Sequence, residues 1–430
     1  MESPAPAVRP LRILWTMPYL PWPTTSGGKS RQYHLLRRMA ERGHRITLLV
    51  QSKTPLDDEG RARLEPLVEQ LIVLPRRPLK HPLTLWHAAL SPWPLLTTVN
   101  GHAPALADRF EALLAEGGWD VVQIEHSYGF QPFEAPLSRH RQPFVLCEHN
   151  VESQLGVATY GKWPWFLRPF ARYDQWRARR WERRVLAQAS AVAAVTEADA
   201  RVMTRLSGGQ PVGVVANGVD TRAFAQVTPA VGSDKVLFVG NYEYAPNVDA
   251  IEWALTEVFP RLWRQRPETR FIVCGHALPE AWPRRFTDAR IEWRGYVSDL
   301  TGVQAEAAAF LAPLRFGGGS KLKVLEALAA GLPLVSTPEG VSGLEVVDGE
   351  HAHLGGSAQG LAEALAGVLS QPTQARALGE AGRAHVAARF DWSASAAQLE
   401  ALYERLPTLH RLGGVRGQGV GPLAANEEVA

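Results

Sequence analysis

Two segments of the sequence place glycines and basic residues together, each in a loop after an apolar run typical of a β-strand. The first segment covers residues 25–31 and the second covers residues 315–323. The residues of interest are Gly27, Gly28, Lys29 and Arg31 in the first segment, and Arg315, Gly318, Gly319, Ser320, Lys321 and Lys323 in the second. A helical pattern follows each segment, so we expect both to be loops that lead into a helix N-terminus.

The basic residues at these two helix starts predict an anion site. A helix N-terminus carries unpaired N–H groups and partial positive charge, so cations in its first turn are unfavourable by about 0.3–1 kcal/mol. A bound diphosphate would turn this repulsion into attraction, and glycines let the backbone approach it. The alternative is that the long side chains turn into solvent. That explanation suits a single lysine, but the repetition of the pattern favours the anion site.

Glu326 lies one helical turn after Lys323 and is expected to share its face of the helix. Its two carboxylate oxygens could accept hydrogen bonds from both hydroxyls of a ribose, while the lysine lies nearer the phosphates. The alternative is a Glu-Lys pair on a solvated face, but the neighbours Leu325, Ala327 and Leu328 indicate burial. Neither glycine segment matches the dinucleotide-binding fingerprint or the P-loop, which argues against simple NAD or ATP binding.

Histidines end two strand-like runs of the first half. His149 follows residues 144–148, and Glu125-His126 ends the run before it. Because the carboxyl ends of parallel strands meet at one edge of a sheet, both are expected to face the same cleft. A neutral imidazole can hydrogen-bond a sugar hydroxyl or a developing charge. The alternative for either histidine is a structural hydrogen bond.

The elements that must position these residues alternate along the chain. In the first half we expect strands at residues 11–17, 45–51, 71–74, 121–125, 144–148 and 191–196, with a helix at about 29–42. In the second half we expect strands at residues 236–240, 271–274, 291–293, 309–313 and 334–336. Short apolar strands separated by helices predict an α/β fold with parallel sheets.

The turn Asn217-Gly218 separates the two alternating patterns, and we place a hinge there. The predicted organisation is a first Rossmann-like domain at 1–218, a second at 219–390, a terminal helix at 391–408, and a disordered tail at 409–430. The alternative is that Asn217-Gly218 forms a turn inside one domain.

The composition excludes several classes of protein. The 430 residues include 46 basic and 43 acidic side chains, a surplus too small to predict nucleic-acid binding. The two cysteines, Cys147 and Cys274, are far apart and each ends an apolar run, which argues against a disulfide framework or a zinc site. No apolar stretch is long enough to span a membrane. A cytoplasmic location is therefore expected.

Residues 162–184 combine four tryptophans with many arginines in a helical pattern. One interpretation is peripheral contact with anionic lipid at the inner face of the membrane. The other, which we favour, is that the tryptophans form the core face of a helix whose arginines lie in water. The tryptophans are Trp163, Trp165, Trp176 and Trp181.

The run from Gly317 to Thr337 resembles the donor-binding segment of the retaining family 4 glycosyltransferases, which have the GT-B fold, and especially the branch acting in exopolysaccharide assembly. Further similarities occur in the expected order over residues 11–406. They are Gly27-Gly28, Asn217 to Asp220, Phe238 to Asn241, Arg294 to Val297, and Phe390-Asp391-Trp392. The resemblance implies two facing Rossmann-like domains and a C-terminal helix that crosses back to the first.

The resemblance also implies roles for individual residues. Glu326 would hold the ribose of a nucleotide-sugar donor, the backbone around Tyr296 and Val297 the base, Gly27-Gly28 the phosphates, and His149 the region of the transferred sugar. Gly240 and Asn241, at the start of the second domain, would contact the donor. Glu125 and His126 are secondary candidates for site residues. The departing phosphate would itself take the acceptor's proton, so neither a metal nor a cofactor is implied.

Two positions depart from the family pattern. Gly318 stands where relatives carry a first glutamate near the donor sugar, and Asn241 and Ala245 stand where many carry Arg and Lys against the diphosphate. We expect Lys321, Lys323 or Arg315 to supply that charge.

The sequence thus predicts a glycosyltransferase that moves a sugar from a nucleoside-diphosphate sugar to a glycan or lipid-linked acceptor with retention. Two alternatives remain open at this point. A sugar-nucleotide 2-epimerase shares the architecture, and the missing glutamate is compatible with a non-catalytic nucleotide-binding protein.

Overall fold

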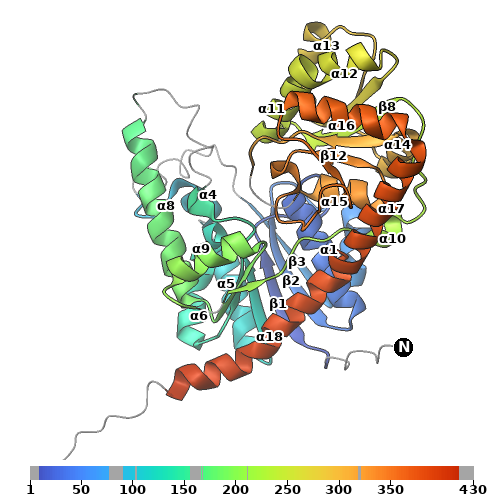
Figure 1. Cartoon of the computed structure of the whole chain (residues 1–430). Helices are drawn as coiled ribbons and strands as arrows, with labels where there is room; N and C mark the ends of the chain where they lie inside the picture. The colour runs from blue at the N-terminus through green and yellow to red at the C-terminus, as the bar shows by residue number, and fades with distance from the viewer. Residues whose placement is uncertain are drawn as a thin grey trace, which may run out of the picture.

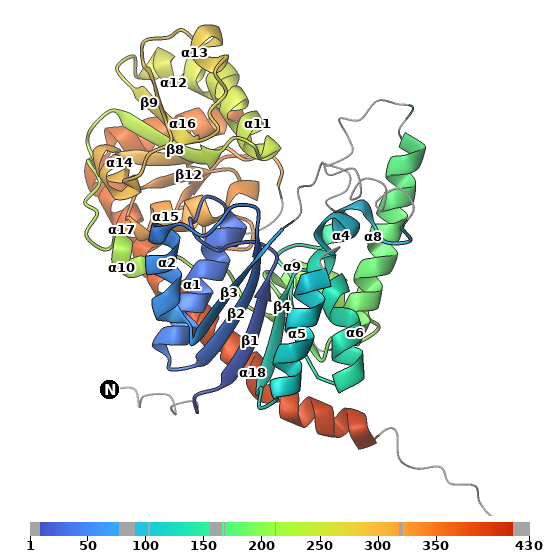
Figure 2. The same cartoon turned by 180° about the vertical axis from the view of Figure 1, so that it is seen from behind.

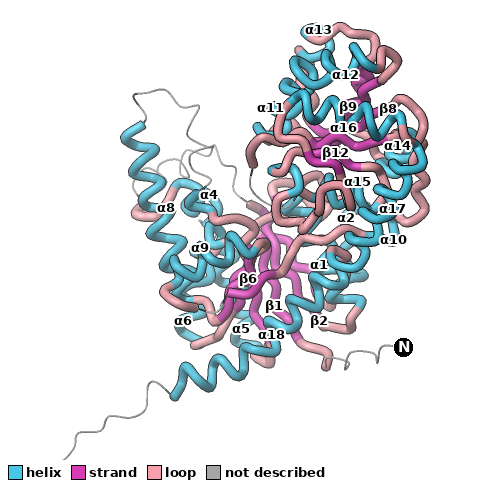
Figure 3. The backbone as a smooth tube through the Cα atoms, in the orientation of Figure 1, coloured by secondary structure: helices cyan, strands magenta, loops and turns pink. Residues whose placement is uncertain are grey.

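The computed structural model divides into two lobes, each built around a parallel sheet (Figures 1 and 3). It describes residues 9–76, 91–101, 104–154, 166, 168–210, 212–317 and 321–415. We call the lobe that contains β1 the first lobe and the lobe that contains β8 the second lobe.

The first lobe holds a seven-stranded parallel sheet in the order β3-β2-β1-β4-β5-β6-β7. Successive residues of its central strands face opposite sides, so that Ile13 and Trp15 enter one core cluster while Leu14 enters another. Both faces are buried, which explains the near-continuous apolar strands. The strands are β1 (Arg12–Met17), β2 (Arg45–Ser52), β3 (Gln70–Pro75), β4 (Val121–Glu125), β5 (Val145–Cys147), β6 (Ala191–Ala194) and β7 (Val212–Val214).

Helices cover both faces of this sheet, and Figure 2 shows α1 and α2 on one side of β1 and β2 with α5 and α6 on the other side of the lobe. The described helices of the lobe are α1 (Gly27–Glu41), α2 (Asp58–Leu64), η1 (Glu65–Leu67), α4 (Leu95–Gly101), α5 (Pro104–Glu116), η2 (Ser127–Gly129), α6 (Gln131–His140), α8 (Arg168–Gln188) and α9 (Glu197–Ser207).

The second lobe holds a six-stranded parallel sheet in the order β10-β9-β8-β11-β12-β13. Val236 and Phe238 face one helical layer while Leu237 faces the other. The strands are β8 (Lys235–Asn241), β9 (Arg270–His276), β10 (Ile291–Gly295), β11 (Ala309–Ala312), β12 (Leu334–Ser336) and β13 (His353–Leu354). The helices are α10 (Thr221–Phe224), α11 (Ala245–Trp253), η4 (Ala254–Val258), α12 (Phe259–Gln265), α13 (Trp282–Arg285), α14 (Leu300–Glu306), α15 (Leu322–Ala329), η5 (Glu339–Val341), α16 (Ala358–Ser370) and α17 (Pro372–Arg389).

In both sheets the first strand of the lobe lies in the interior and the order reverses beside it, between β1 and β4 and between β8 and β11. Ligands of such open sheets bind at these switch points, beyond the carboxyl ends of the strands. The prediction of two Rossmann-like α/β domains with parallel sheets is confirmed. The short strands β7 and β13 were not predicted.

The terminal helix α18 (Trp392–Val415) leaves the second lobe and crosses to the first, where it lies along α1 (Figure 1). Its residues Trp392, Leu399 and Tyr403 belong to the core cluster of the first lobe. The helix ends at Val415, beyond residue 408, where the sequence predicted its end. Residues 416–430 of the predicted disordered tail lie outside the described residues.

Two chain segments connect the lobes and run side by side. The N–H of Val219 donates to the carbonyl of Phe390 at 2.7 Å, and the N–H of Trp392 donates back to Val219 at 3.3 Å. A Cβ on Gly218 would lie 2.8 Å from the backbone nitrogen of Trp392, so this close approach requires glycine.

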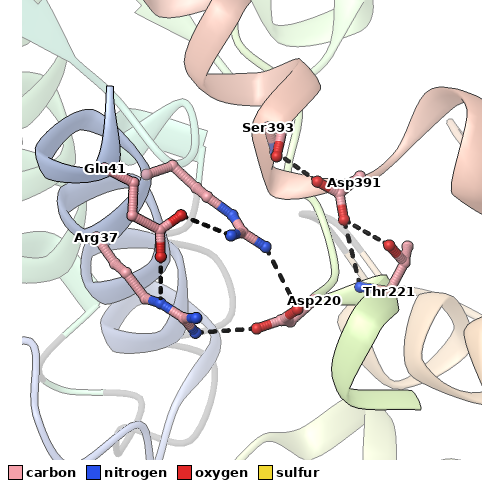
Figure 4. A network of polar contacts seen from close by, with 7 residues as sticks. Arg37, Glu41, Asp220, Thr221, Asp391 and Ser393 are labelled. Carbon is pink, nitrogen blue, oxygen red and sulfur yellow. Dashed lines mark hydrogen bonds and ion pairs between the residues drawn. The ribbon is translucent and has the colours of Figure 1, made fainter. Parts of the chain in front are cut away.

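Side chains fix both connections to α1, as Figure 4 shows. Asp220 accepts from Arg37 at 3.0 Å and from Arg38 at 3.3 Å, and Glu41 holds both guanidinium groups from the other side. Asp391 accepts from the hydroxyl of Thr221 at 2.6 Å, which links the two connections. The contacts of Asp220 and Asp391 therefore link helix α1 to both connections between the lobes.

Candidate functional site

Two large cavities lie at the carboxyl edges of the sheets. The inter-lobe pocket has a volume of about 710 Å³ and is lined by both lobes, and the first-lobe pocket has about 800 Å³ and is lined by the loops after β1 to β5. Ser26 and Gly27 line both pockets, so the two cavities adjoin at the start of α1.

Helix α15 carries the strongest candidate residues of the inter-lobe pocket. Its apolar face, which includes Leu325 and Leu328, is buried in the second lobe, and this orientation leaves Lys323 and Glu326 half-buried in the pocket wall. In the described part of the chain, the Glu326 carboxylate receives no hydrogen bond or ion pair. The pocket thus presents a carboxylate that is available to a ligand.

Burial shifts the pKa values of Glu326 and Lys323, the two ionisable groups of α15 in the pocket, in opposite directions. It raises the pKa of Glu326 to about 7, although the ammonium of Lys323 counteracts the shift. It lowers the pKa of Lys323 to about 7, assisted by the positive charge of Lys321 and opposed by Glu326. Paired, oppositely perturbed groups in a cleft are characteristic of functional sites.

Lysines, but not Arg315, bring positive charge to this pocket. Lys321 is buried at the start of α15, where its Nζ donates to the carbonyl of Gly317 at 2.7 Å and pairs with Glu339 at 3.1 Å. Lys323 donates to the amide oxygen of Asn247. Arg315 instead makes an ion pair with Asp249, donating from Nε to Oδ2 at 2.9 Å, and does not line the pocket. Its long side chain turns towards α11, and a contribution of Arg315 to the diphosphate charge stays a prediction.

The end of β8 forms a second wall. Gly240 and Asn241 line the pocket, and a Cβ on Gly240 would lie 2.8 Å from the ring of Phe238 and 3.2 Å from the amide of Asn247. Asn241 uses its side-chain oxygen to accept the N–H of Glu243, so it folds back on its own loop. Asn247 was not predicted, although its position after β8 at a switch point could have indicated it.

The loop after β10 closes the pocket from the side. Tyr296 and Val297 line it, and the side chain of Tyr296 is 67% exposed, far more than a packed aromatic residue needs. Gly295 adopts a left-handed conformation, with φ of 58°, which turns the chain at this point. The predicted residues Gly318, Gly319 and Ser320 lie outside the described residues.

From the first lobe, α1 points its N-terminus at the junction of the two pockets. Ser26 caps the helix by accepting the N–H of Lys29, and the helix begins at Gly27. A Cβ on Gly27 would lie 3.4 Å from Leu322 of α15, so the two helix starts approach each other closely. The N–H groups of the first turn are therefore near the phosphate-sized space between the lobes.

The two basic residues that follow these glycines go to different places. Lys29 lines the first-lobe pocket rather than the inter-lobe pocket, and burial together with the charge of Lys53 lowers its pKa. Arg31 is buried and donates to Asn217 in the connection between the lobes. Arg31 lines neither pocket, and its role as a phosphate ligand stays a prediction.

His149 lines the first-lobe pocket and is oriented by a buried carboxylate. Its Nε2 lies 3.0 Å from Glu125, which also accepts from the indole of Trp15 at 2.9 Å. Burial and the neighbouring His126 lower the pKa of His149 to about 3, so its imidazole is neutral. With Nε2–H donating to the carboxylate, Nδ1 is the acceptor, and it lies 3.4 Å from where a Cβ on Gly28 would be.

The structure therefore groups most of the predicted site residues. Glu326, Lys323, Lys321, Gly240, Asn241, Tyr296, Val297 and Gly27 meet in the inter-lobe pocket, and Gly28, Lys29, His126 and His149 meet in the first-lobe pocket. Glu125 supports His149 from behind. Sequence reasoning missed Tyr19, Lys53, Arg76 and Glu152, which come from loops after four different strands.

Within residues 162–184, the structure describes 166 and 168–184, so Trp163 and Trp165 lie outside it. Trp181 is 5% exposed and donates to the carbonyl of Ser127 at 2.8 Å, which agrees with a core face. Trp176 is 56% exposed, so the interpretation of the tryptophans as core residues is wrong for it. It points to the solvent side of α8, where Arg180 stacks on it.

Comparison with known proteins bears on both lobes. Residues 25–223 match the family model described as Glycosyltransferase Family 4, and residues 233–371 match the model described as Glycosyl transferases group 1. The chain is 26% identical over 414 residues to the glycogen synthase of Mycobacterium tuberculosis, covering 92% of this chain and 94% of that protein.

Two further proteins extend the comparison. The phosphatidyl-myo-inositol mannosyltransferase of Mycolicibacterium smegmatis is 25% identical over 317 residues, which cover 70% of this chain and 75% of that protein. The crystal structure of Anabaena HepE in complex with UDP and glucose superposes with a TM-score of 0.63 at 16% identity, covering 93% of this chain and all of that chain. At this low identity, the similarity to HepE is evidence for the fold alone.

Proposed function

We propose that this chain is a glycosyltransferase of the GT-B type that transfers a hexosyl group from a nucleoside-diphosphate sugar to a glycan or lipid-linked acceptor with retention of anomeric configuration, and the matches to two glycosyltransferase family models support this proposal. The observation that carries the proposal is the Glu326 carboxylate, held beside Lys323 in a pocket between the lobes and bound by no described residue. We place the reaction in exopolysaccharide or cell-envelope glycan assembly on the cytoplasmic side.

The donor would lie along α15. The ribose hydroxyls donate to Glu326, the base lies against the Tyr296–Val297 loop, and the diphosphate lies between Lys321, Lys323 and the N-terminus of α1. A carboxylate that accepts two hydroxyl hydrogen bonds contributes about 1.5–3 kcal/mol for each. HepE was solved with UDP, so a uridine diphosphate sugar is the first donor class to test, with guanosine diphosphate sugars second.

The transfer itself needs a stabilised leaving group. The bond between C1 of the sugar and the diphosphate oxygen breaks, the acceptor oxygen bonds to C1 on the same face, and the departing phosphate takes the acceptor's proton. The lysines and the N–H groups of α1 would stabilise the developing negative charge without a metal ion. His149 would accept a hydrogen bond from a sugar hydroxyl through Nδ1.

The acceptor would occupy the first-lobe pocket, which adjoins the inter-lobe pocket at Gly27. Lys29 and Lys53 both line it, and neither ammonium has a carboxylate partner in the described part of the chain. Two nearby cations repel each other unless an anion lies between them. We therefore propose that the acceptor is negatively charged, as a phosphate-linked lipid is.

Contact with an anionic membrane would bring such an acceptor to the pocket. No described helix has the length and apolar character to cross a bilayer. Helix α8 instead exposes Tyr173 and Trp176, and the exposed Arg180 lies over the ring of Trp176 at 5.7 Å. Aromatic and basic residues together partition to a lipid interface. Liposome flotation of Trp176→Ala tests this contact, and binding equal to wild type excludes it.

The proposed activity is tested in two stages. A thermal-shift screen of nucleoside diphosphates identifies the base, because a ligand at 100 times its Kd stabilises the protein by about 2.7 kcal/mol. The matching nucleotide sugars are then incubated with and without membrane lipid extract. We expect release of the nucleoside diphosphate to accelerate with acceptor, and the product to keep the donor's anomeric configuration by NMR.

Variants and controls sharpen the test. Glu326→Ala and His149→Ala should each abolish transfer, whereas Glu116→Ala and His140→Ala, at exposed or half-exposed positions away from both pockets, should not. Release of an epimerised sugar without acceptor would instead establish a 2-epimerase. Retention of full transfer by Glu326→Ala and His149→Ala would overturn the assignment of the site.

A further inference from the structure

Three side chains beside the first-lobe pocket direct potential ligand atoms at one another. His126 follows β4, and Glu148 and Glu152 follow β5. The imidazole nitrogen of His126 and one carboxylate oxygen from each glutamate lie within 4.8 Å of one another. His126 and Glu152 also line the pocket, so the cluster is accessible from solvent.

Two of these atoms are buried without a hydrogen-bond partner in the described part of the chain. They are Nδ1 of His126 and Oε2 of Glu148, and their residues are 4% and 0% exposed. The other polar atoms of both side chains are occupied. Nε2 of His126 lies 3.2 Å from the hydroxyl of Tyr19, and Oε1 of Glu148 accepts the N–H of Ser127 at 2.7 Å. A buried polar atom without a partner is costly, so a ligand is expected to satisfy both.

The charge of the cluster indicates the kind of ligand. Glu148 and Glu152 have no ion pair with any described Lys or Arg. The nearest further acid, Glu182, accepts the backbone N–H of Glu152 at 2.8 Å and of Ser153 at 3.3 Å, so it adds negative charge rather than removing it. A cation between the two glutamates would balance the site.

The spacing suits a metal ion. Nδ1 of His126 and Oε1 of Glu152 are 3.7 Å apart, too long for a hydrogen bond. Two ligands that each lie about 2.0–2.2 Å from one ion are separated by this order of distance. The ring of His126 stacks on Tyr128 at 4.7 Å between ring centroids and contacts His149 at 4.1 Å.

We propose that His126, Glu148 and Glu152 bind one divalent metal ion of the Zn²⁺ or Mn²⁺ type. One imidazole and two carboxylates match the preferences of these ions, and their two negative charges match its two positive charges. In this arrangement Nε2–H of His126 donates to the hydroxyl of Tyr19, and Glu148 accepts the N–H of Ser127, and both are supporting contacts of the kind that orient metal ligands. The ion joins the loops after β4 and β5, and its remaining coordination positions face the first-lobe pocket, where an oxygen of water or of an acceptor can bind.

The site is separate from the donor pocket, and the proposal does not rest on the proposed function. Its test uses the full chain without an affinity tag that binds metal. The protein is stripped with chelator, dialysed, and titrated calorimetrically with Zn²⁺, Mn²⁺, Mg²⁺ and Ca²⁺ in separate experiments. We expect one equivalent of Zn²⁺ or Mn²⁺ to bind, and Co²⁺ to give a visible absorption spectrum from a site containing nitrogen.

Variants assign the ligands. Glu152→Gln, at a half-buried position, should lower the affinity at least tenfold, whereas Glu116→Gln, on the exposed face of α5, should leave it unchanged. Glu148→Gln gives an independent second ligand substitution. Circular dichroism confirms folding of each. Absence of stoichiometric binding by all four ions, or equal affinity in wild type and Glu152→Gln, would overturn the proposal and leave a shared proton as the occupant.

Discussion

The affinity for the nucleotide-sugar donor should depend on pH with a maximum near pH 7. In the proposed complex Glu326 must be ionised to accept the ribose hydroxyls, and Lys323 must be protonated to attract the diphosphate. Burial brings the pKa of both groups to about 7, from opposite directions. The carboxylate is lost as pH falls below this value, and the ammonium is lost as pH rises above it.

The size of the effect follows from these values. At pH 7 about half of each group is in the required state, so the apparent Kd is about four times the intrinsic Kd. At pH 5.5 or pH 8.5 one group is in the required state in about one molecule of 33, so the apparent Kd is about 33 times the intrinsic value. Affinity should therefore fall about eightfold in each direction.

Isothermal titration calorimetry at pH 5.5, 7.0 and 8.5 and constant ionic strength measures this profile. A nucleotide sugar is the appropriate ligand, because its diphosphate has no group that titrates in this range. Glu326→Gln should remove only the loss of affinity at acid pH. Lys323→Met should remove only the loss of affinity at alkaline pH. A loss of affinity at acid pH that persists in Glu326→Gln would refute the assignment of Glu326 to the ribose.

Three further predictions concern the support of the site. Asp220→Ala leaves the buried Arg38 without its partner in the lobe connection and should lower the unfolding free energy, measured by urea denaturation, by about 1–3 kcal/mol. Glu41→Ala, at a half-exposed position, should lower it by less than about 1 kcal/mol. Equal losses in the two variants would contradict the coupling. Trp181→Ala removes a buried core side chain and should cost about 3–5 kcal/mol in the same assay; a cost below 1 kcal/mol would show that it does not hold α8. Gly240→Ala forces a shift of the Phe238 ring and crowds the amide of Asn247, and it should weaken donor binding measurably by calorimetry; unchanged affinity would show that this wall of the pocket adapts.

The sequence predicts the sheets well because their strands are buried on both faces. Runs such as those of β1 and β4 are mostly apolar, and their boundaries are visible without knowledge of their neighbours. The strands that were not predicted, β7 and β13, are short and only half-buried. Their pairing depends on the strands beside them, which a local pattern does not contain.

The site was predicted less completely, because long side chains form ion pairs and hydrogen bonds with residues that are distant in sequence. Arg315 turns to Asp249, and Arg31 turns to Asn217, although both stand at the expected helix starts. Glu326, by contrast, was predicted correctly as facing a cleft, because the apolar residues around it fix the rotation of its helix. The sequence predicts that the loops after β4 and β5 meet at one edge of the sheet, but it does not show that Glu148 and Glu152 direct their carboxylates at His126.

The central claim is that Glu326 holds the ribose of a nucleotide donor between the lobes. It is tested most directly by a double-mutant cycle that compares a nucleoside diphosphate with its 2′,3′-dideoxy analogue in wild type and Glu326→Ala. The dideoxy analogue lacks both hydroxyls that would donate to the carboxylate. The wild-type protein should therefore bind the ribose form at least tenfold more tightly than the dideoxy form. The account predicts that Glu326→Ala binds both forms with equal affinity, and an undiminished preference in this variant would contradict it.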